Sequence, residues 1–147
     1  MPTVLICSDA PWVHDEIRAA IPGGDTVIRS VTAGRAVRDV VATEEPDLVI
    51  LDMQISDMGA IAVTYDLRLE ASGGRSPEVP ILLLLDRNAD TYLAKQCDSD
   101  GWLIKPLDPI RVRKAMRAIL AGERYEDRPQ VGDASTNFRA TADSTAR

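Results

Sequence analysis

Three charged residues stand at or just beyond the ends of aliphatic runs, and their side chains could do chemistry together. Asp9, Asp52 and Lys105 each follow such a run. Two carboxylates brought close together repel each other, and a hard divalent cation with a nearby ammonium relieves that repulsion. An acidic pair with a cation and a lysine predicts a pocket that binds a phosphoryl group between the metal and the lysine.

These side chains can meet only if the fold brings the ends of separate segments together. Short apolar runs without polar alternation are typical of strands covered on both faces, and a more polar run suits an edge strand. The expected strands are residues 4–7, 26–29, 47–51, 79–85 and 101–104. The expected helices are residues 11–21, 33–45, 58–71, a short one within 86–98, and one beginning at 108. This alternation predicts a parallel sheet with helices on both faces, whose strand ends form a ligand crevice.

Composition limits the classes of protein that remain. The 147 residues are 45% hydrophobic, which suits one domain with a packed core. The net charge of −6 argues against a surface that binds nucleic acid by neutralising phosphates. Cys7 and Cys97 form no redox or zinc motif, and no apolar run is long enough to cross a membrane, so we expect a cytoplasmic protein. We expect a domain over residues 1–122 and a polar, disordered tail over 123–147.

Four stretches give the chain a resemblance to a known family. They read VLICSDAP at 4–11, DLVILDMQISDM at 47–58, VPILLLL at 79–85 and GWLIKP at 101–106. In order and spacing they resemble the receiver domain of two-component response regulators, over about residues 3–121. The resemblance implies a flavodoxin-like α/β fold, a doubly wound five-stranded parallel sheet in the order 2-1-3-4-5 with five flanking helices.

The resemblance also implies roles for individual residues. Asp52 looks like the aspartate that accepts a phosphoryl group from a kinase phosphohistidine, and Lys105 looks like the lysine that pairs with it. Asp9 would be the principal carboxylate ligand of Mg²⁺, with Asp52 and the backbone carbonyl of Gln54 as further ligands. Pro106 fits the family's cis peptide bond.

The chain also departs from the family pattern at its pocket. Ser8 stands where the family has a second acid, so we expect weak Mg²⁺ binding. Leu85 replaces a hydroxyl residue and Asp86 a small one. Because Leu85 cannot donate a hydrogen bond, it lacks the hydroxyl group that in the family couples phosphorylation to an aromatic switch, whose position Trp102 takes here.

Other residues have ordinary interpretations. His14 is expected at the surface of the first helix, and Trp102 is expected to pack half-buried against the last helix. A basic stretch on the last helix predicts a solvated face rather than a binding surface. That stretch comprises Arg111, Arg113, Lys114 and Arg117.

Two functions remain open. The first is a receiver that takes its phosphoryl group from a sensor histidine kinase or phosphotransfer protein and signals to an output protein through its fourth helix, fifth strand and fifth helix. The second is a pseudo-receiver that binds partners without phosphorylation. Neither is an enzyme, although slow self-dephosphorylation fits the first.

We expect no membrane or direct nucleic-acid partner, and dimerisation is left open. A dinucleotide-binding oxidoreductase would need a glycine-rich turn after the first strand, and this chain has none there. A D-x-D phosphohydrolase is disfavoured as well, because Met53 and Gln54 follow Asp52.

Overall fold

The computed structural model describes residues 1–21 and 24–128. Its centre is a parallel six-stranded sheet in the order β2-β1-β3-β4-β5-β6. The strands are β1 (Thr3–Cys7), β2 (Val27–Val31), β3 (Leu48–Asp52), β4 (Ile81–Leu85), β5 (Gly101–Ile104) and β6 (Tyr125–Glu126). The helices are α1 (Pro11–Ala20), α2 (Arg35–Glu44), α3 (Ala60–Ser72), α4 (Thr91–Gln96) and α5 (Pro109–Leu120), with a 3-10 turn η1 (Asn88–Asp90) before α4.

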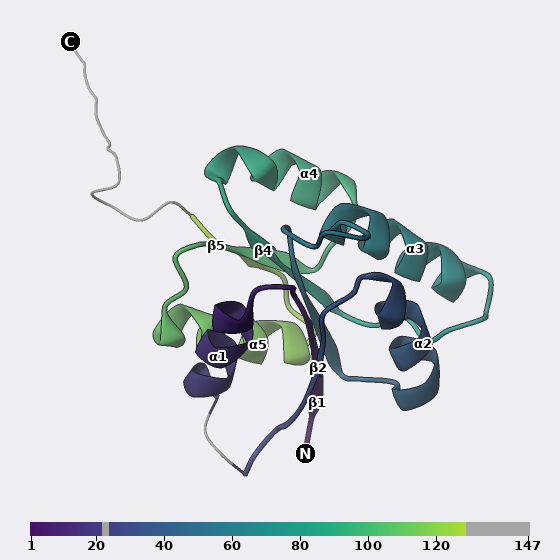
Figure 1. Cartoon of the computed structure of the whole chain (residues 1–147), viewed down its shortest axis with the longest axis horizontal. Coiled ribbons are helices and arrows are strands. Elements are labelled where there is room, and N and C mark those ends of the chain that lie inside the picture. Colours follow the sequence, from purple (N-terminus) through teal and green to yellow (C-terminus); the bar gives the residue numbers. More distant parts are fainter. Residues whose placement is uncertain (22–23, 129–147) are drawn as a thin grey trace.

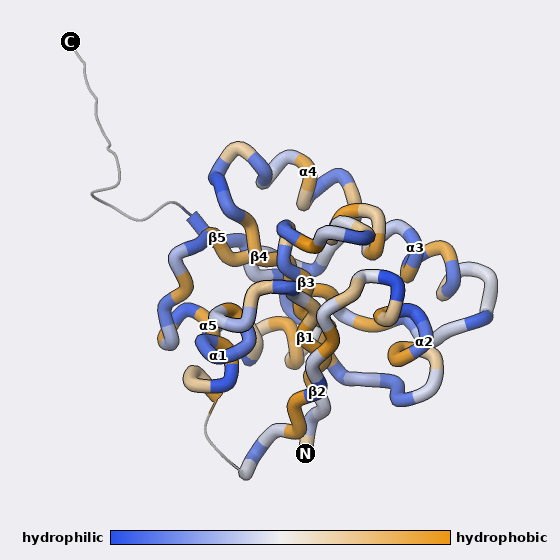
Figure 2. The backbone as a smooth tube through the Cα atoms, viewed as in Figure 1, coloured by the Kyte–Doolittle hydropathy of each residue, from blue (hydrophilic) through white to orange (hydrophobic). Residues whose placement is uncertain are grey.

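The helices cover both faces of the sheet, as Figure 1 shows. Successive side chains of a strand point to opposite faces, so each strand contributes to two cores. Leu5 and Leu83 face the side covered by α2, α3 and α4, whereas Ile6 and Leu84 face α1 and α5. Every residue of β3, β4 and β5 is buried, and apolar positions concentrate in these central strands in Figure 2. The predicted α/β fold and strand order are therefore confirmed.

Local sequence explains where several helices begin. Pro11 and Pro109 occupy the first turns of α1 and α5, where the missing amide proton of proline costs nothing. Asp108 caps α5, because its Oδ1 accepts a hydrogen bond from the backbone N–H of Ile110 at 2.8 Å. The fourth helix is short, as expected from the sequence, with only six residues.

The sixth strand is a difference from the five-stranded prediction. Residues 123–128 were expected to belong to the polar tail, yet Tyr125 pairs with Gly101 and Glu126 with Trp102. Asp127 is also buried. The reason is that β5 would otherwise be an edge strand with unpaired backbone groups, and β6 satisfies some of them. The rest of the predicted tail, residues 129–147, lies outside the described residues.

Within residues 1–21 and 24–128, no helix has the length and apolar character that a membrane span requires.

Candidate functional site

Asp52 lies at the carboxyl end of β3 and is almost completely enclosed. Its side chain is 1% exposed. Oδ1 accepts hydrogen bonds from Lys105 Nζ at 2.6 Å and from the backbone N–H of Gln54 at 3.2 Å. Oδ2 accepts a hydrogen bond from the hydroxyl of Ser8 at 2.7 Å. The carboxylate is thus held by groups that follow the ends of β3, β1 and β5, which are the strand ends that the sequence predicts to converge.

Lys105 is shared between two carboxylates. Besides Asp52, its ammonium donates to Asp86 Oδ1 at 2.9 Å, and the other oxygen of Asp86 accepts from Gln54 Nε2 at 2.8 Å. Burial opposes the charge on Lys105, but the hydrogen bonds to Asp52 and Asp86 outweigh it and raise the pKa of the lysine. Burial also opposes ionisation of Asp86, and bonds from Lys105 and Gln54 prevail and lower the pKa of that carboxyl. Both groups are therefore charged near neutral pH.

An aromatic ring stands beside this ion pair. The ammonium of Lys105 lies 5.5 Å from the centre of the Trp12 indole, a cation–π distance. Trp12 belongs to the first turn of α1 and is 47% exposed. The indole therefore forms part of the pocket's solvent side.

Asp9 belongs to the same strand-end region but engages another group. Its Oδ2 accepts a hydrogen bond from the backbone N–H of Ser56 at 3.0 Å. Hydrogen bonds from Ser56 lower the pKa of Asp9, although the side chain is exposed. Asp57, in the same loop after β3, accepts from the backbone N–H groups of Gly34 and Arg35 at 2.8 and 3.2 Å. These two carboxylates fasten the β3–α3 loop to β1 and to the start of α2.

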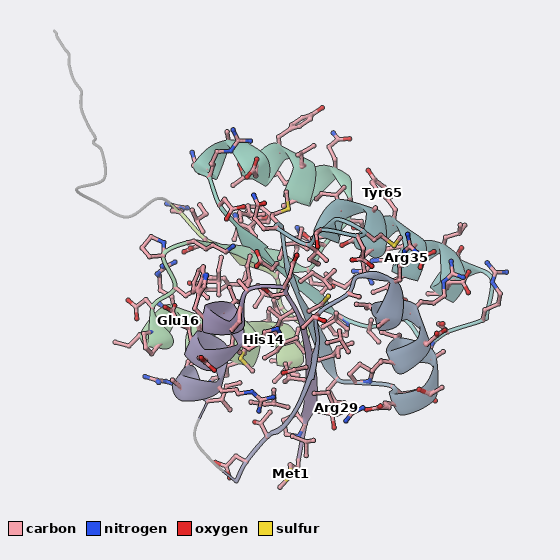
Figure 3. All side chains as sticks on the ribbon, in the orientation of Figure 1. Met1, His14, Glu16, Arg29, Arg35 and Tyr65 are labelled. Carbon is pink, nitrogen blue, oxygen red and sulfur yellow. The ribbon has the colours of Figure 1, made fainter. Side chains whose placement is uncertain are left out.

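Ser8 takes the position of the missing acid and closes the pocket. It is fully buried, donates to Asp52, and its Oγ accepts the backbone N–H of Ala10 at 3.0 Å. Its carbonyl oxygen accepts from His14 Nε2 at 2.8 Å. His14, labelled on α1 in Figure 3, is therefore half-buried and hydrogen-bonded. The sequence had predicted a position at the helix surface. The correction follows from the turn after β1, which brings the Ser8 carbonyl to α1.

The donor atoms predicted for Mg²⁺ are two carboxylates and one backbone carbonyl, from Asp9, Asp52 and Gln54. Within the described ranges, no group of three Asp, Glu, His or Cys side chains converges on a point where a metal could bind. Ser8 brings no charge, both oxygens of Asp52 already accept hydrogen bonds, and Asp9 bonds to Ser56. Asp9 and Gln54 lie in the loops after β1 and β3, and Asp52 ends β3, so the predicted ligands share one end of the sheet, and Mg²⁺ binding by them stays a prediction.

The residues predicted to transmit a signal lie in β4, in β5 and just after β5. Leu85 is completely buried in the core on the α2, α3 and α4 side. Trp102 is also buried there, at 2% exposure, and not half-buried against α5 as predicted. The reason is strand alternation, since Leu103 and not Trp102 faces α5. The Lys105–Pro106 peptide bond is cis, and Pro106 lies at the surface next to the pocket.

Sequence reasoning missed two sets of contacts. It identified Asp86 only as the replacement of a small residue and not as the second partner of Lys105, although an acid directly after β4 was an available signal. It also assigned Arg111 to a solvated face, whereas this guanidinium bonds the carboxylate of Asp127 and is only 14% exposed. That contact depends on β6, which the polar composition of residues 123–128 did not reveal.

Comparison with known proteins identifies the class to which this fold and pocket belong. The chain matches the family described as "Response regulator receiver domain" over residues 4–117. It is a member of this family. The fold class and the kinship with two-component response regulators, both expected from the strand-end motifs, are confirmed.

Several relatives and solved structures show the extent of the likeness. The chain is 23% identical to the nitrate/nitrite response regulator protein NarL of Escherichia coli K12, over 99% of this chain and 67% of NarL. It is 26% identical to Protein PilH of Pseudomonas aeruginosa, over 83% of this chain and all of PilH. A putative response regulator from Chloroflexus aurantiacus shares the fold with a TM-score of 0.74 and 20% identity, over 82% of this chain and 98% of that one. The chain spans only about half the length of several other curated relatives.

Proposed function

We propose that this receiver accepts a phosphoryl group on Asp52 from the phosphohistidine of a sensor histidine kinase or phosphotransfer protein. The observation that carries the proposal is the 2.6 Å contact between Lys105 Nζ and Asp52 Oδ1, made by residues from the ends of two parallel strands. A carboxylate attacks a negatively charged phosphoryl group only when that charge is balanced and the groups are held in line. Lys105 is the balancing charge in this chain.

The transfer requires one bond to form and one to break. An oxygen of Asp52 bonds to phosphorus while the bond from phosphorus to the imidazole nitrogen breaks. The imidazole keeps that electron pair. Lys105, which already contacts Asp52, then balances charge on the phosphoryl oxygens. Because the Asp52 side chain is 1% exposed, the pocket has to open before the donor reaches it.

The cofactor and the partners belong to the same proposal. Mg²⁺ stays a prediction, with Asp9, Asp52 and the Gln54 carbonyl as its candidate ligands and with weak affinity, since Ser8 supplies no charge. Signalling by protein–protein contact at α4, β5 and α5 and a cytoplasmic location likewise stay predictions, and dimerisation stays open.

A second function is favoured by the enclosure of the pocket. Every oxygen of the Asp52 carboxylate already has a partner within the chain, and Leu85 offers no hydroxyl to a phosphoryl oxygen. A pocket satisfied in this way suits a pseudo-receiver, which binds partners in one fixed conformation.

One experiment separates the two functions. The protein is incubated with acetyl phosphate, with and without Mg²⁺, and its intact mass is measured. The first function predicts an adduct of one phosphoryl group in the wild type and none in Asp52→Asn. Lys105→Ala should keep the circular dichroism spectrum of the wild type and lose most of the adduct. An unmodified wild type at saturating donor would refute phosphorylation and favour the pseudo-receiver.

A further inference from the structure

The outer edge of β5 carries backbone groups that need partners. A five-stranded sheet in the order 2-1-3-4-5 would leave this edge open, and an open edge is a template for another strand. Here the segment of residues 123–128, which we call the C-terminal strap, lies along it. Tyr125 N–H donates to the carbonyl of Asp100 at 3.2 Å, and Asp127 N–H donates to the carbonyl of Trp102 at 3.3 Å. The strap therefore fills the edge by strand addition.

Asp127 anchors the strap to both β5 and α5. One carboxylate oxygen accepts the backbone N–H of Ile104 at 2.9 Å and also pairs with the guanidinium of Arg111. The side chains of Asp127 and Arg111 are only 5% and 14% exposed. The carbonyl oxygen of Asp127 accepts from Trp102 Nε1 at 3.2 Å. Asp127 thus bonds to the backbone of β5, to Arg111 of α5 and to the indole of Trp102.

Glycine at position 101 is a further sign that the edge is shaped for the strap. A Cβ atom built on Gly101 would lie 2.2 Å from the carbonyl oxygen of Tyr125, far inside any normal contact. Any other residue at this position would force β6 away from β5. The close backbone approach at Gly101 and the contacts of Asp127 involve different residues, and both indicate a specific position for residues 123–128 along β5.

We infer that the outer edge of β5 is a docking site for an extended strand, and that its resident occupant is the chain's own C-terminal strap. This site lies on the side formed by α4, β5 and α5, where the proposed function places the output partner; in that respect the inference rests on the proposed function. A second copy of this chain that pairs with the β5 edge must displace the strap first. Peptide recognition by strand addition gains its affinity from the same backbone groups.

Hydrogen exchange on the full-length chain tests the strap directly. The Ile104 amide should be protected in the wild type, because its acceptor is Asp127. In Asp127→Ala this amide should exchange at least about tenfold faster, since removing one partner of a buried ion pair leaves the other charge unpaired. Trypsin should also cut after Arg124 more rapidly. Glu123→Ala is the matched control, because it removes an exposed acid from the same segment and should behave as the wild type.

Gly101→Ala provides a second route to the same state with Asp127 intact. It should also expose the Arg124 cleavage site, while the amides of β1 and β3 stay protected and show that the domain is folded. Sedimentation at increasing concentration then reports whether the freed edge binds a second copy: Asp127→Ala should self-associate and the wild type should not. Unchanged cleavage and Ile104 exchange in both variants would overturn the strap, and a freed strap without self-association would overturn the docking site. Neither result depends on phosphorylation, so the proposed function is tested separately.

Discussion

Replacing Asp86 by asparagine should speed phosphorylation of Asp52. In the structure Asp86 holds the ammonium of Lys105 at 2.9 Å and so competes with an incoming phosphoryl group for it. A hydrogen bond between charged groups contributes about 1.5–3 kcal/mol. The Asp86 side chain is 29% exposed, so solvent screening reduces this to roughly 1–1.4 kcal/mol. Since 1.4 kcal/mol corresponds to about a factor of ten, the expected gain is about five- to tenfold.

The assay is the initial rate of adduct formation with acetyl phosphate, measured by intact mass. Asparagine has the size of aspartate and can still accept a hydrogen bond from Gln54, so the change is mainly the loss of one charge. Asp98→Asn is the matched control, because it removes an exposed acid that precedes β5, at the opposite end of the strand from Lys105. Equal rates in the wild type, Asp86→Asn and Asp98→Asn would refute the competition for Lys105.

Three further predictions concern the metal, pH and the thiols. Without Mg²⁺, Ser8→Asp should lower the melting temperature, because it buries a second charge beside that of Asp52. Adding Mg²⁺ should raise the melting temperature of Ser8→Asp more than that of the wild type. Equal Mg²⁺ shifts of the two proteins in thermal melts would contradict this. Asp66 has a pKa lowered by its hydrogen bond from Arg38, so this pair stabilises the fold above the unfolded pKa of about 3.9 and loses its effect as pH falls through the folded value. Urea unfolding should therefore show Asp66→Asn less stable than the wild type by about 0.5–1 kcal/mol at pH 7, with a difference that shrinks as the pH falls below the unfolded pKa, and a constant difference would refute the assignment. Burial raises the pKa of Cys7 to about 12, so a thiol reagent should modify it only after unfolding, and rapid labelling of the native protein at pH 8 would contradict its burial.

The central part of the fold follows from the sequence for clear physical reasons. Continuous aliphatic runs such as residues 81–85 can be satisfied only between two layers of helices, and the structure buries all of them. The meeting of Asp52 and Lys105 follows as well, because the carboxyl ends of all the parallel strands, here β3 and β5 with β4 between them, lie at one end of the sheet.

The remaining features depend on tertiary contacts that no local pattern reports. Residues 123–128 are polar, and their strand forms because Asp127 pairs with Arg111 and the backbone of this segment pairs with the outer edge of β5. Likewise, the second bond of Lys105 to Asp86 depends on how the β4 end approaches the β5 end. Tyr65, which extends from α3 in Figure 3 and bonds the Gln96 carbonyl of α4 at 3.3 Å, is another contact of this kind.

The account rests on Asp52 as the acceptor, and chemical trapping of the acyl phosphate tests this most directly. Borohydride converts an aspartyl phosphate to homoserine, which peptide mass spectrometry can locate after treatment with acetyl phosphate. We expect homoserine at position 52, in an amount that grows with the intact-mass adduct and rises further in Asp86→Asn. Trapping at another carboxylate, or none at position 52 when the adduct is present, would contradict the central claim.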